Sequence, residues 1–211
     1  MSPETGDFEE EAGRTPGVRV ESPFPLVAVP RVWTWIEEFH DRIADDYGPK
    51  TLDEFVESWR RQERTRRTWG VWRGAELGGL IIWQAGPIPE AGETHALFKR
   101  EFWGRATTRA AAALVYAELF GEGVRKIMAF PFASNRAVIA LALSLGFVRE
   151  GMLREQTLKK GQPVDVAVLG LLRKDFEALL EKEQECHRSP SEPRSSEAES
   201  PPVSPATEPR K

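Results

Sequence analysis

The segment from Thr94 to Phe120 constrains the fold of this chain more than any other stretch. It opens with aromatic and aliphatic residues typical of a strand, turns at Trp103-Gly104-Arg105, and continues into an alanine-rich helix. Thr107 and Thr108 stand where that helix would begin, and Gly121 stands where it would end. Such a turn points main-chain N–H groups at one place, which suits an anion such as phosphate. Packing alone also explains it, so both interpretations stay open at this point.

The overall composition excludes several classes of protein. The chain has 211 residues, of which 40% are hydrophobic, enough for one domain with a sizeable core and additional tails. Its formal net charge of −4 does not favour a nucleic-acid partner, and no apolar run approaches the roughly 20 residues of a membrane span. The single cysteine, Cys186, cannot form an internal disulfide, and no secretory signal is apparent. We therefore expect a cytoplasmic protein with neither a nucleic-acid nor a membrane partner.

Changes in composition along the chain predict three regions. Residues 1–17 are acidic and rich in glycine and proline, which is typical of a flexible leader. Residues 18–182 carry the periodic apolar patterns of a folded domain. Residues 183–211 are dominated by serine, proline and glutamate and are expected to form a disordered tail.

Within the domain, helical and strand patterns alternate. This order predicts a mixed α/β sheet with at least two crossover helices. The expected elements are an edge strand within 18–29, helices over 31–46 and from residue 52, a hairpin over 68–84, a strand over 94–102 with its helix to 120, a strand over 126–132 with its helix to 145, a hairpin over 147–172, and a last helix over 174–183. Thr51 is the expected N-cap of the second helix, with Glu54 three residues later, and the last hairpin is expected to turn around Lys160-Gly161-Gln162.

A second motif lies about thirty residues after the first turn. Ser134-Asn135-Arg136 opens a helix that ends in Leu145-Gly146-Phe147, and the segment REGMLRE follows at residues 149–155. Together with the loop from Glu101 to Ala106, this motif resembles the GNAT acetyltransferase superfamily. The similarity is greatest to the branch that acetylates N-terminal amines of ribosomal proteins and to related small-amine acetyltransferases, and it covers roughly Val18 to Leu180.

The resemblance implies a fold and a cofactor. GNAT domains have a splayed, mixed central sheet flanked by helices, with acetyl-CoA in the gap where two central strands diverge. In the family's loop pattern, Gly104 and Ala106 match, whereas Glu101 stands where glutamine or arginine is usual. Leu97 and Phe98 are expected to offer main-chain groups to the cofactor, and Asn135 matches a cofactor-binding asparagine. The full set of expected cofactor-binding residues is Leu97, Phe98, Trp103, Gly104, Arg105, Ala106, Thr107, Thr108 and Asn135.

The expected chemistry needs a base but no metal ion. An amine must be neutral before it can attack a thioester carbonyl. Glu93 and His95 are the candidates for the catalytic role, because alternate residues of a strand share a face. Many GNAT enzymes use a tyrosine to protonate the leaving thiolate, but Ala142 stands at that position here. Either residue of the Glu93–His95 pair can instead be an ordinary strand residue.

Two functions follow from this reading. The first is an acetyl-CoA-dependent N-acetyltransferase that moves an acetyl group to a primary amine, on either a small molecule or a protein N-terminus. The alternative is a catalytically weak or inactive GNAT-like domain that acts as a binding module, which Glu101, the missing tyrosine and the long tail favour. Asp41, Asp45 and Asp46 on the first helix are interpreted as a solvated helix face, or else as attracting a cationic amine. The acceptor, the acyl chain length and the oligomeric state stay open.

Overall fold

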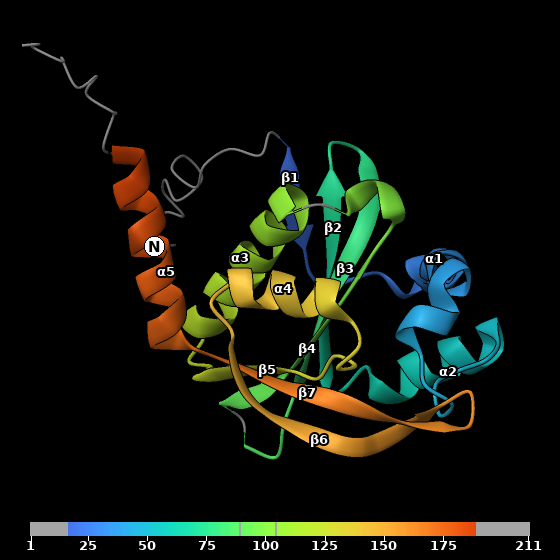
Figure 1. Cartoon of the computed structure of the whole chain (residues 1–211). Helices are drawn as coiled ribbons and strands as arrows, with labels where there is room; N and C mark the ends of the chain where they lie inside the picture. The colour runs from blue at the N-terminus through green and yellow to red at the C-terminus, as the bar shows by residue number, and fades with distance from the viewer. Residues whose placement is uncertain (1–16, 89, 104, 189–211) are drawn as a thin grey trace, which may run out of the picture.

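The computed structural model describes residues 17–88, 90–103 and 105–188. Seven strands form one sheet in the order β1-β2-β3-β4-β5-β7-β6 (Figure 1). All neighbouring strands are antiparallel except β4 and β5, which are parallel. The strands are β1 Val18–Glu21, β2 Arg66–Arg73, β3 Glu76–Ala85, β4 Ala91–Phe98, β5 Lys126–Ala129, β6 Val148–Lys159 and β7 Gln162–Leu172. The structure confirms the predicted mixed α/β class.

The helices cover both faces of this sheet. They are α1 Val29–Ile43, α2 Leu52–Gln62, α3 Arg105–Gly121, α4 Arg136–Ser144 and α5 Arg173–Arg188, with short 3-10 turns η1 Leu26–Ala28 and η2 Arg100–Phe102. Helices α1 and α2 pack together on one side of the sheet, whereas α3, α4 and α5 lie on the other (Figure 1). No helix in the described part of the chain is long and apolar enough to cross a membrane.

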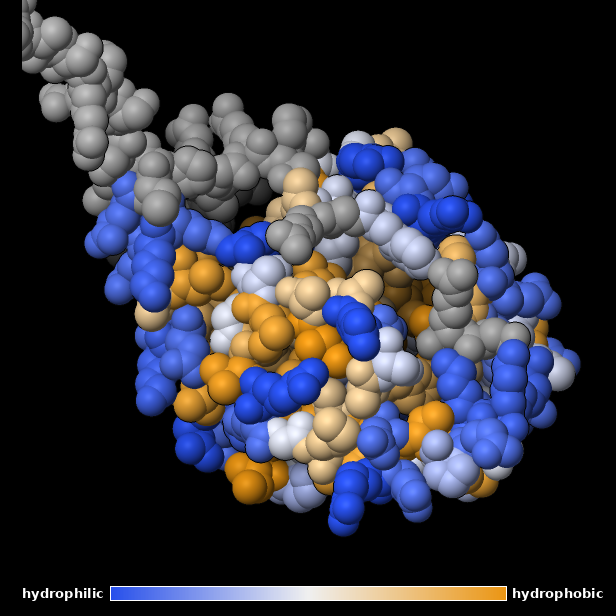
Figure 2. Space-filling view, in the orientation of Figure 1, coloured by the Kyte–Doolittle hydropathy of each residue, from blue (hydrophilic) through white to orange (hydrophobic). Residues whose placement is uncertain are grey.

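Alternation along the strands divides the core into two. Odd-numbered residues of β2 and β3, such as Trp69 and Ile81, face α3 and α4, whereas even-numbered residues of β3, Leu80 and Ile82, face α1 and α2. On the α4 side, Figure 2 shows apolar side chains over the middle of the surface, with a hollow to their right. Val138 and Leu143 are the exposed apolar residues that α4 contributes to this side.

The predicted helix starts and stops are largely confirmed. The Thr51 hydroxyl accepts a hydrogen bond from the N–H of Glu54 at 3.2 Å, so Thr51 caps α2 as its sequence pattern predicted. At the end of α4, Gly146 has φ +91°, a left-handed conformation that closes helices and that side chains disfavour. The last hairpin turns at Lys160 and Gly161, which both have positive φ.

Both central strands end earlier in the sequence than predicted. The strand expected over 94–102 begins at Ala91 and ends at Phe98, because residues 100–102 wind into η2, where the Trp103 N–H bonds to the Arg100 carbonyl. The next strand ends at Ala129 rather than at residue 132, because Pro131 has no N–H to continue a ladder. Phe132 instead forms an isolated bridge with Val166 of β7.

The predicted boundary of the C-terminal tail is wrong by six residues. Helix α5 continues to Arg188, although residues 183–211 were expected to be disordered. Residues 181–185 are Glu, Lys and Gln, which form helices readily, and the first proline comes at residue 190. The carboxylate of Glu183 also forms an ion pair with Arg109 of α3. The leader up to residue 16 and the tail from residue 189 lie outside the described residues.

Candidate active site

The sheet opens at its centre. Strands β4 and β5 pair only through Ala91, Gly92 and Glu93, whose partners are Lys126, Ile127 and Met128. Beyond Glu93, β4 continues for five residues to Phe98 without a partner on this edge, while β5 ends one residue after Met128. The predicted V-shaped gap between two central strands is therefore present.

The register of β4 decides which main-chain groups face this gap. The N–H of Lys99 bonds to Gly78 at 2.8 Å and the N–H of Gly86 bonds to Ala91 at 2.9 Å, so the odd-numbered residues of β4 pair with β3. Hydrogen-bonded pairs alternate along an antiparallel ladder, so the N–H and C=O groups of Ala96 and Phe98 point to the other edge. The main-chain groups of Leu97, which were expected to bind the cofactor, turn toward β3, and those of Ala96 face the gap instead.

The helix α3 begins where the sequence predicted an anion site. Its helical residues begin at Arg105, so the first-turn N–H groups of residues 105–108 have no partner inside the helix. Thr107 and Thr108 are buried, and the Thr108 hydroxyl donates to the Phe102 carbonyl at 3.5 Å. These two threonines can therefore serve an anion through their N–H groups only, whereas Ala106 is exposed. Gly104 lies outside the described residues.

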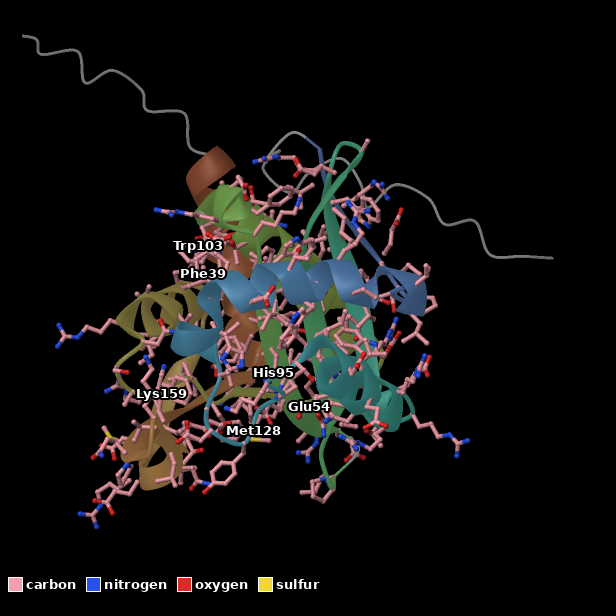
Figure 3. All side chains as sticks on the ribbon, turned by 90° about the vertical axis from the view of Figure 1, so that its right-hand side faces the viewer. Phe39, Glu54, His95, Trp103, Met128 and Lys159 are labelled. Carbon is pink, nitrogen blue, oxygen red and sulfur yellow. The ribbon has the colours of Figure 1, made fainter. Side chains whose placement is uncertain are left out.

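Trp103 has a role that its sequence position did not reveal. Its indole Nε1 donates a hydrogen bond to the Phe98 carbonyl at 2.9 Å, and its ring lies 4.8 Å from that of Phe39 on α1 (Figure 3). Trp103 thus ties the loop before α3 to the first helix. It also occupies one of the two carbonyls that β4 turns toward the gap.

Asn135 lies at the N-terminus of α4, as the sequence predicted. Its side-chain oxygen accepts a hydrogen bond from the N–H of Val138 at 3.3 Å, which caps the helix. The cap occupies Oδ1, so the donors that Asn135 can offer to a cofactor are those on Nδ2.

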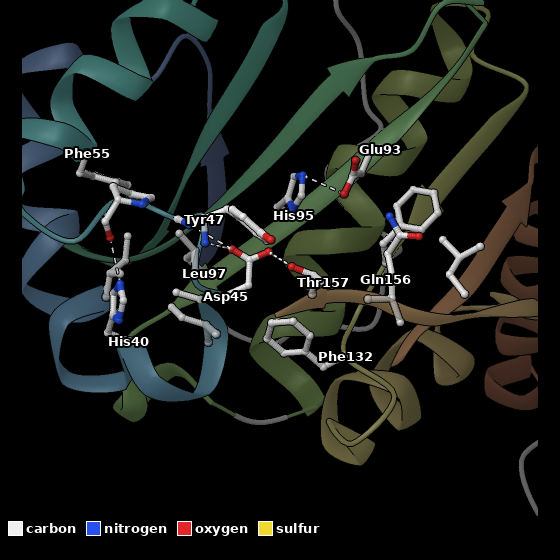
Figure 4. A pocket seen from close by; sticks show the side chains of 18 residues that line it. His40, Asp45, Tyr47, Phe55, Glu93, His95, Leu97, Phe132, Gln156 and Thr157 are labelled. Carbon is white, nitrogen blue, oxygen red and sulfur yellow. Dashed lines mark hydrogen bonds and ion pairs between the residues drawn. The ribbon is translucent and has the colours of Figure 1, made fainter. Parts of the chain in front are cut away.

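A cavity of about 770 Å³ lies beside β4, on the side of α1 and α2 (Figure 4). Glu93, His95 and Leu97 of β4 line one wall, and Phe132 and Thr157 come from the segment before α4 and from β6. The loop between α1 and α2 closes the remaining side. The side chains of Glu93, His95 and Leu97 thus enter the cavity. The main-chain groups of Ala96 and Phe98, on the same strand, face the gap.

Glu93 and His95 form a pair inside this cavity, as the alternation of the strand predicted (Figure 4). The Nε2 atom of His95 lies 3.1 Å from the Oε1 atom of Glu93. Although 48% of the His95 side chain is accessible, burial of the ring lowers the pKa of His95 below its ordinary value of 6.5; the Glu93 carboxylate opposes this shift and the Arg66 guanidinium adds to it. At neutral pH the imidazole is therefore uncharged and able to accept a proton.

Neither the residue at the position of the family's tyrosine, Ala142, nor the buried Tyr116 reaches the cavity. Tyr116 is buried in the core between α3 and the sheet, where burial raises its pKa to about 12. Ala142 is buried in the same core and carries no titratable group. Neither residue lines the cavity.

Asp45 and Asp46 hold the cavity together, which the sequence analysis missed. Both lie beyond the end of α1 at Ile43, not on a helix face. Asp45 accepts hydrogen bonds from the N–H groups of Tyr47 and Gly48, at 3.1 and 3.0 Å, and from the Thr157 hydroxyl at 2.7 Å.

Asp46 binds the tip of the last hairpin. Its two carboxylate oxygens accept the N–H groups of Lys160 and Gly161, at 2.8 and 2.7 Å, and these bonds lower the pKa of Asp46. Its own N–H donates to the Leu158 carbonyl at 2.8 Å. We call Asp45 and Asp46, with these contacts, the aspartate clasp. The sequence Asp-Asp-Tyr-Gly is a turn signal, but the partner of the turn lies more than 100 residues away.

Comparisons with known proteins agree with this geometry. The family model of the acetyltransferase (GNAT) domain matches residues 21–148. No curated protein sequence matches the chain significantly. Similar solved structures include a spermidine N-acetyltransferase from Vibrio cholerae in complex with CoA and spermine, with 17% identity, a TM-score of 0.66, and coverage of 76% of this chain and 98% of that one.

A ribosomal-protein-alanine N-acetyltransferase from Brucella melitensis is also similar, with 17% identity, a TM-score of 0.62, and coverage of 74% of this chain and 98% of that one. At such identities these structures bear on the fold alone. The family model, however, spans more than half of the chain. The chain therefore belongs to the GNAT acetyltransferase family and is an acyltransferase that uses acetyl-CoA as its co-substrate.

Proposed function

We propose that this protein transfers the acetyl group of acetyl-CoA to a primary amine that binds in the cavity beside β4. One observation carries the proposal: β4 supplies the His95 side chain to the cavity and, from the next residue, Ala96, supplies main-chain groups to the gap. The base and the expected cofactor groups therefore lie one residue apart on a rigid strand.

Three groups of this chain would hold acetyl-CoA, which supplies an activated acetyl thioester. The main-chain groups of Ala96 and Phe98 would bind its pantetheine arm, and the first-turn N–H groups of α3 would bind its pyrophosphate. Asn135 would contribute the donors of Nδ2. The acidic residue of this loop, Glu101, is exposed on η2 and lies before α3 begins.

In the proposed mechanism, His95 of the Glu93–His95 pair is the general base. The neutral imidazole of His95 takes a proton from the ammonium group of the acceptor, and Glu93 stabilises the imidazolium that forms. The neutral amine then attacks the thioester carbonyl carbon, so that a nitrogen–carbon bond forms and the carbon–sulfur bond breaks. The nitrogen also loses a second proton, and the departing thiolate of CoA takes up a proton and leaves as the thiol. A main-chain N–H of Ala96 or Phe98 would stabilise the negative charge on the carbonyl oxygen.

The test combines binding with turnover. Calorimetric titration with acetyl-CoA should show saturable binding, and incubation with amines should release free thiol and give a product one acetyl group heavier by mass spectrometry. An absence of acetyl-CoA binding at millimolar concentration would overturn the proposal.

One observation favours the alternative of a binding module. Trp103 occupies the Phe98 carbonyl, which otherwise faces the gap, and its ring packs against α1. If the indole blocked the pantetheine arm, Trp103→Phe would create acetyl-CoA binding where the unmodified protein has none. Equal binding by both proteins would argue against this alternative.

A further inference from the structure

The cavity contains few carboxylates that could bind an ammonium group. Among its lining residues, only Asp45 and Glu93 carry carboxylates. Both oxygens of Asp45 are already occupied by N–H and hydroxyl donors of the clasp. Glu93 is left, and it is paired with His95 at 3.1 Å. Of the two lining carboxylates, Glu93 is therefore the one that the clasp does not engage, and it lies at the position of the base.

Positive charge lies near two sides of the same cavity. The ammonium of Lys159 lies 4.4 Å from the centre of the Phe132 ring, which is a wall of the cavity. The guanidinium of Arg66 is close enough to His95 to lower its pKa. A second ammonium group on the acceptor would lose its water in the cavity and would find there, besides Glu93, only the Asp45 carboxylate that the clasp already engages. Contact with aromatic rings compensates only part of that loss.

Most of the remaining lining residues are apolar, although His40, Gln156 and Thr157 are polar. Aromatic rings come from Phe55, Phe130 and Phe132, and aliphatic side chains from Ile36, Leu97 and Leu153. At the rim, Tyr47 is 74% exposed and Leu153 is 39% exposed, so both leave apolar surface in water. A ligand with an apolar body would cover this surface and gain from its burial.

From the charge and the apolar surface of the cavity we infer the class of the acceptor, and this inference rests on the proposed function. The acceptor is a primary amine carried on one bulky apolar or aromatic group, without a second cationic centre. The ammonium group lies at Glu93 and His95, and the apolar body lies against Phe55, Phe132 and Leu153. Two sources share this chemistry, namely a free arylalkylamine and a protein N-terminus that begins with a large apolar residue. The inference separates this chain from an enzyme that acts on polyamines.

The test compares four amines as acceptors with saturating acetyl-CoA. The probes are 2-phenylethylamine, a tetrapeptide amide with N-terminal phenylalanine, the same peptide with N-terminal glycine, and spermidine. We expect kcat/KM to be at least about tenfold higher for one of the two phenyl-bearing probes than for spermidine and for the glycine peptide. The preferred phenyl-bearing probe identifies the source, free amine or N-terminus.

A matched pair of variants tests the charge argument directly. Leu153→Glu adds a carboxylate at the exposed rim, on a strand at the edge of the sheet, and Leu153→Gln adds a side chain of the same size without charge. The glutamate variant should raise kcat/KM for spermidine relative to the phenyl-bearing probe by at least about tenfold over the glutamine variant. Equal ratios in the two variants would contradict the charge argument.

Failure of the inference and failure of the proposed function give different results. Faster acetylation of spermidine than of either phenyl-bearing probe overturns the inference and leaves the N-acetyltransferase function intact. Acetyl-CoA binding without acetylation of any probe overturns the proposed function. In that case saturation-transfer NMR with CoA present still decides the inference, which fails if spermidine binds and 2-phenylethylamine does not.

Discussion

Replacing His95 by glutamine tests the proposed base most directly. The variant keeps a polar side chain in the cavity but loses the imidazole that is paired with Glu93. A positioned general base contributes about 10²- to 10⁴-fold in rate, so kcat/KM should fall by that factor. This loss corresponds to about 3–5 kcal/mol of transition-state stabilisation.

The fold should tolerate this change. The His95 side chain is 48% accessible, and within the described residues it forms an ion pair with Glu93 alone. Exposed substitutions of this kind change the free energy of unfolding by about 0.5 kcal/mol or less. The melting temperature should therefore move by no more than about 2 °C, which separates a lost base from a lost fold.

The dependence on pH provides the decisive readout. In the unmodified protein, kcat should fall on the acidic side as His95 becomes protonated, at a pH below 6.5 because burial lowers its pKa. In His95→Gln that limb should disappear. Instead kcat should rise about tenfold per pH unit up to the pKa of the bound amine, since only amine that is already neutral can react.

The assay is continuous detection of released thiol with saturating acetyl-CoA between pH 5.5 and 9, a range of about three and a half units around the relevant pKa values. Glu93→Gln is the matched control, because it keeps the imidazole and removes the carboxylate that raises the His95 pKa. Its acidic limb should move to lower pH. Retention of more than about a tenth of kcat/KM by His95→Gln, or an unchanged acidic limb, would refute the assignment of His95 as base.

Three further changes test other parts of the structure. Ala106→Glu places a carboxylate in the first turn of α3, so acetyl-CoA affinity by calorimetry should fall at least about tenfold relative to Ala106→Gln while the melting temperature is kept, because an acidic residue there favours the helix. Arg66→Met removes a cation that lowers the pKa of His95, so the acidic limb of the rate profile should move to higher pH; an unmoved limb would contradict this coupling. Gly78→Ala puts a Cβ 2.1 Å from the buried Phe102 ring, so urea unfolding should show a loss of about 1–3 kcal/mol, and an unchanged midpoint would show that the ring moves freely.

Local sequence signals predicted most of the fold. The Thr51 cap, the Gly146 helix end and the turn at Lys160 and Gly161 each depend on residues a few positions apart, and each is confirmed. The alternation of β4 likewise predicted that Glu93 and His95 share a face, and they lie 3.1 Å apart. Short-range patterns succeed here because capping, turn geometry and strand alternation are properties of a few consecutive residues.

The features that the sequence did not predict depend on distant partners. Strand periodicity does not distinguish main-chain groups that pair with a neighbour from those that are free, so Leu97 was chosen where the register selects Ala96. The contact of Trp103 with Phe39 joins segments more than 60 residues apart. No local pattern indicates such a contact, because an exposed tryptophan in a loop has the same sequence environment whether or not a partner is present.

Local features and contacts between distant segments determine different properties of the site. Strand β4 supplies both the Glu93–His95 pair, which we propose as the base, and the main-chain groups of Ala96, so the proposed chemistry depends on one rigid element paired along its length with β3. The shape of the cavity, by contrast, depends on the aspartate clasp, which joins the end of α1 to a hairpin more than 100 residues later. Substitutions on β4 should therefore change the rate of acetyl transfer to every amine. Substitutions in the clasp should instead change which amine is preferred, because they move a wall of the cavity without moving the base.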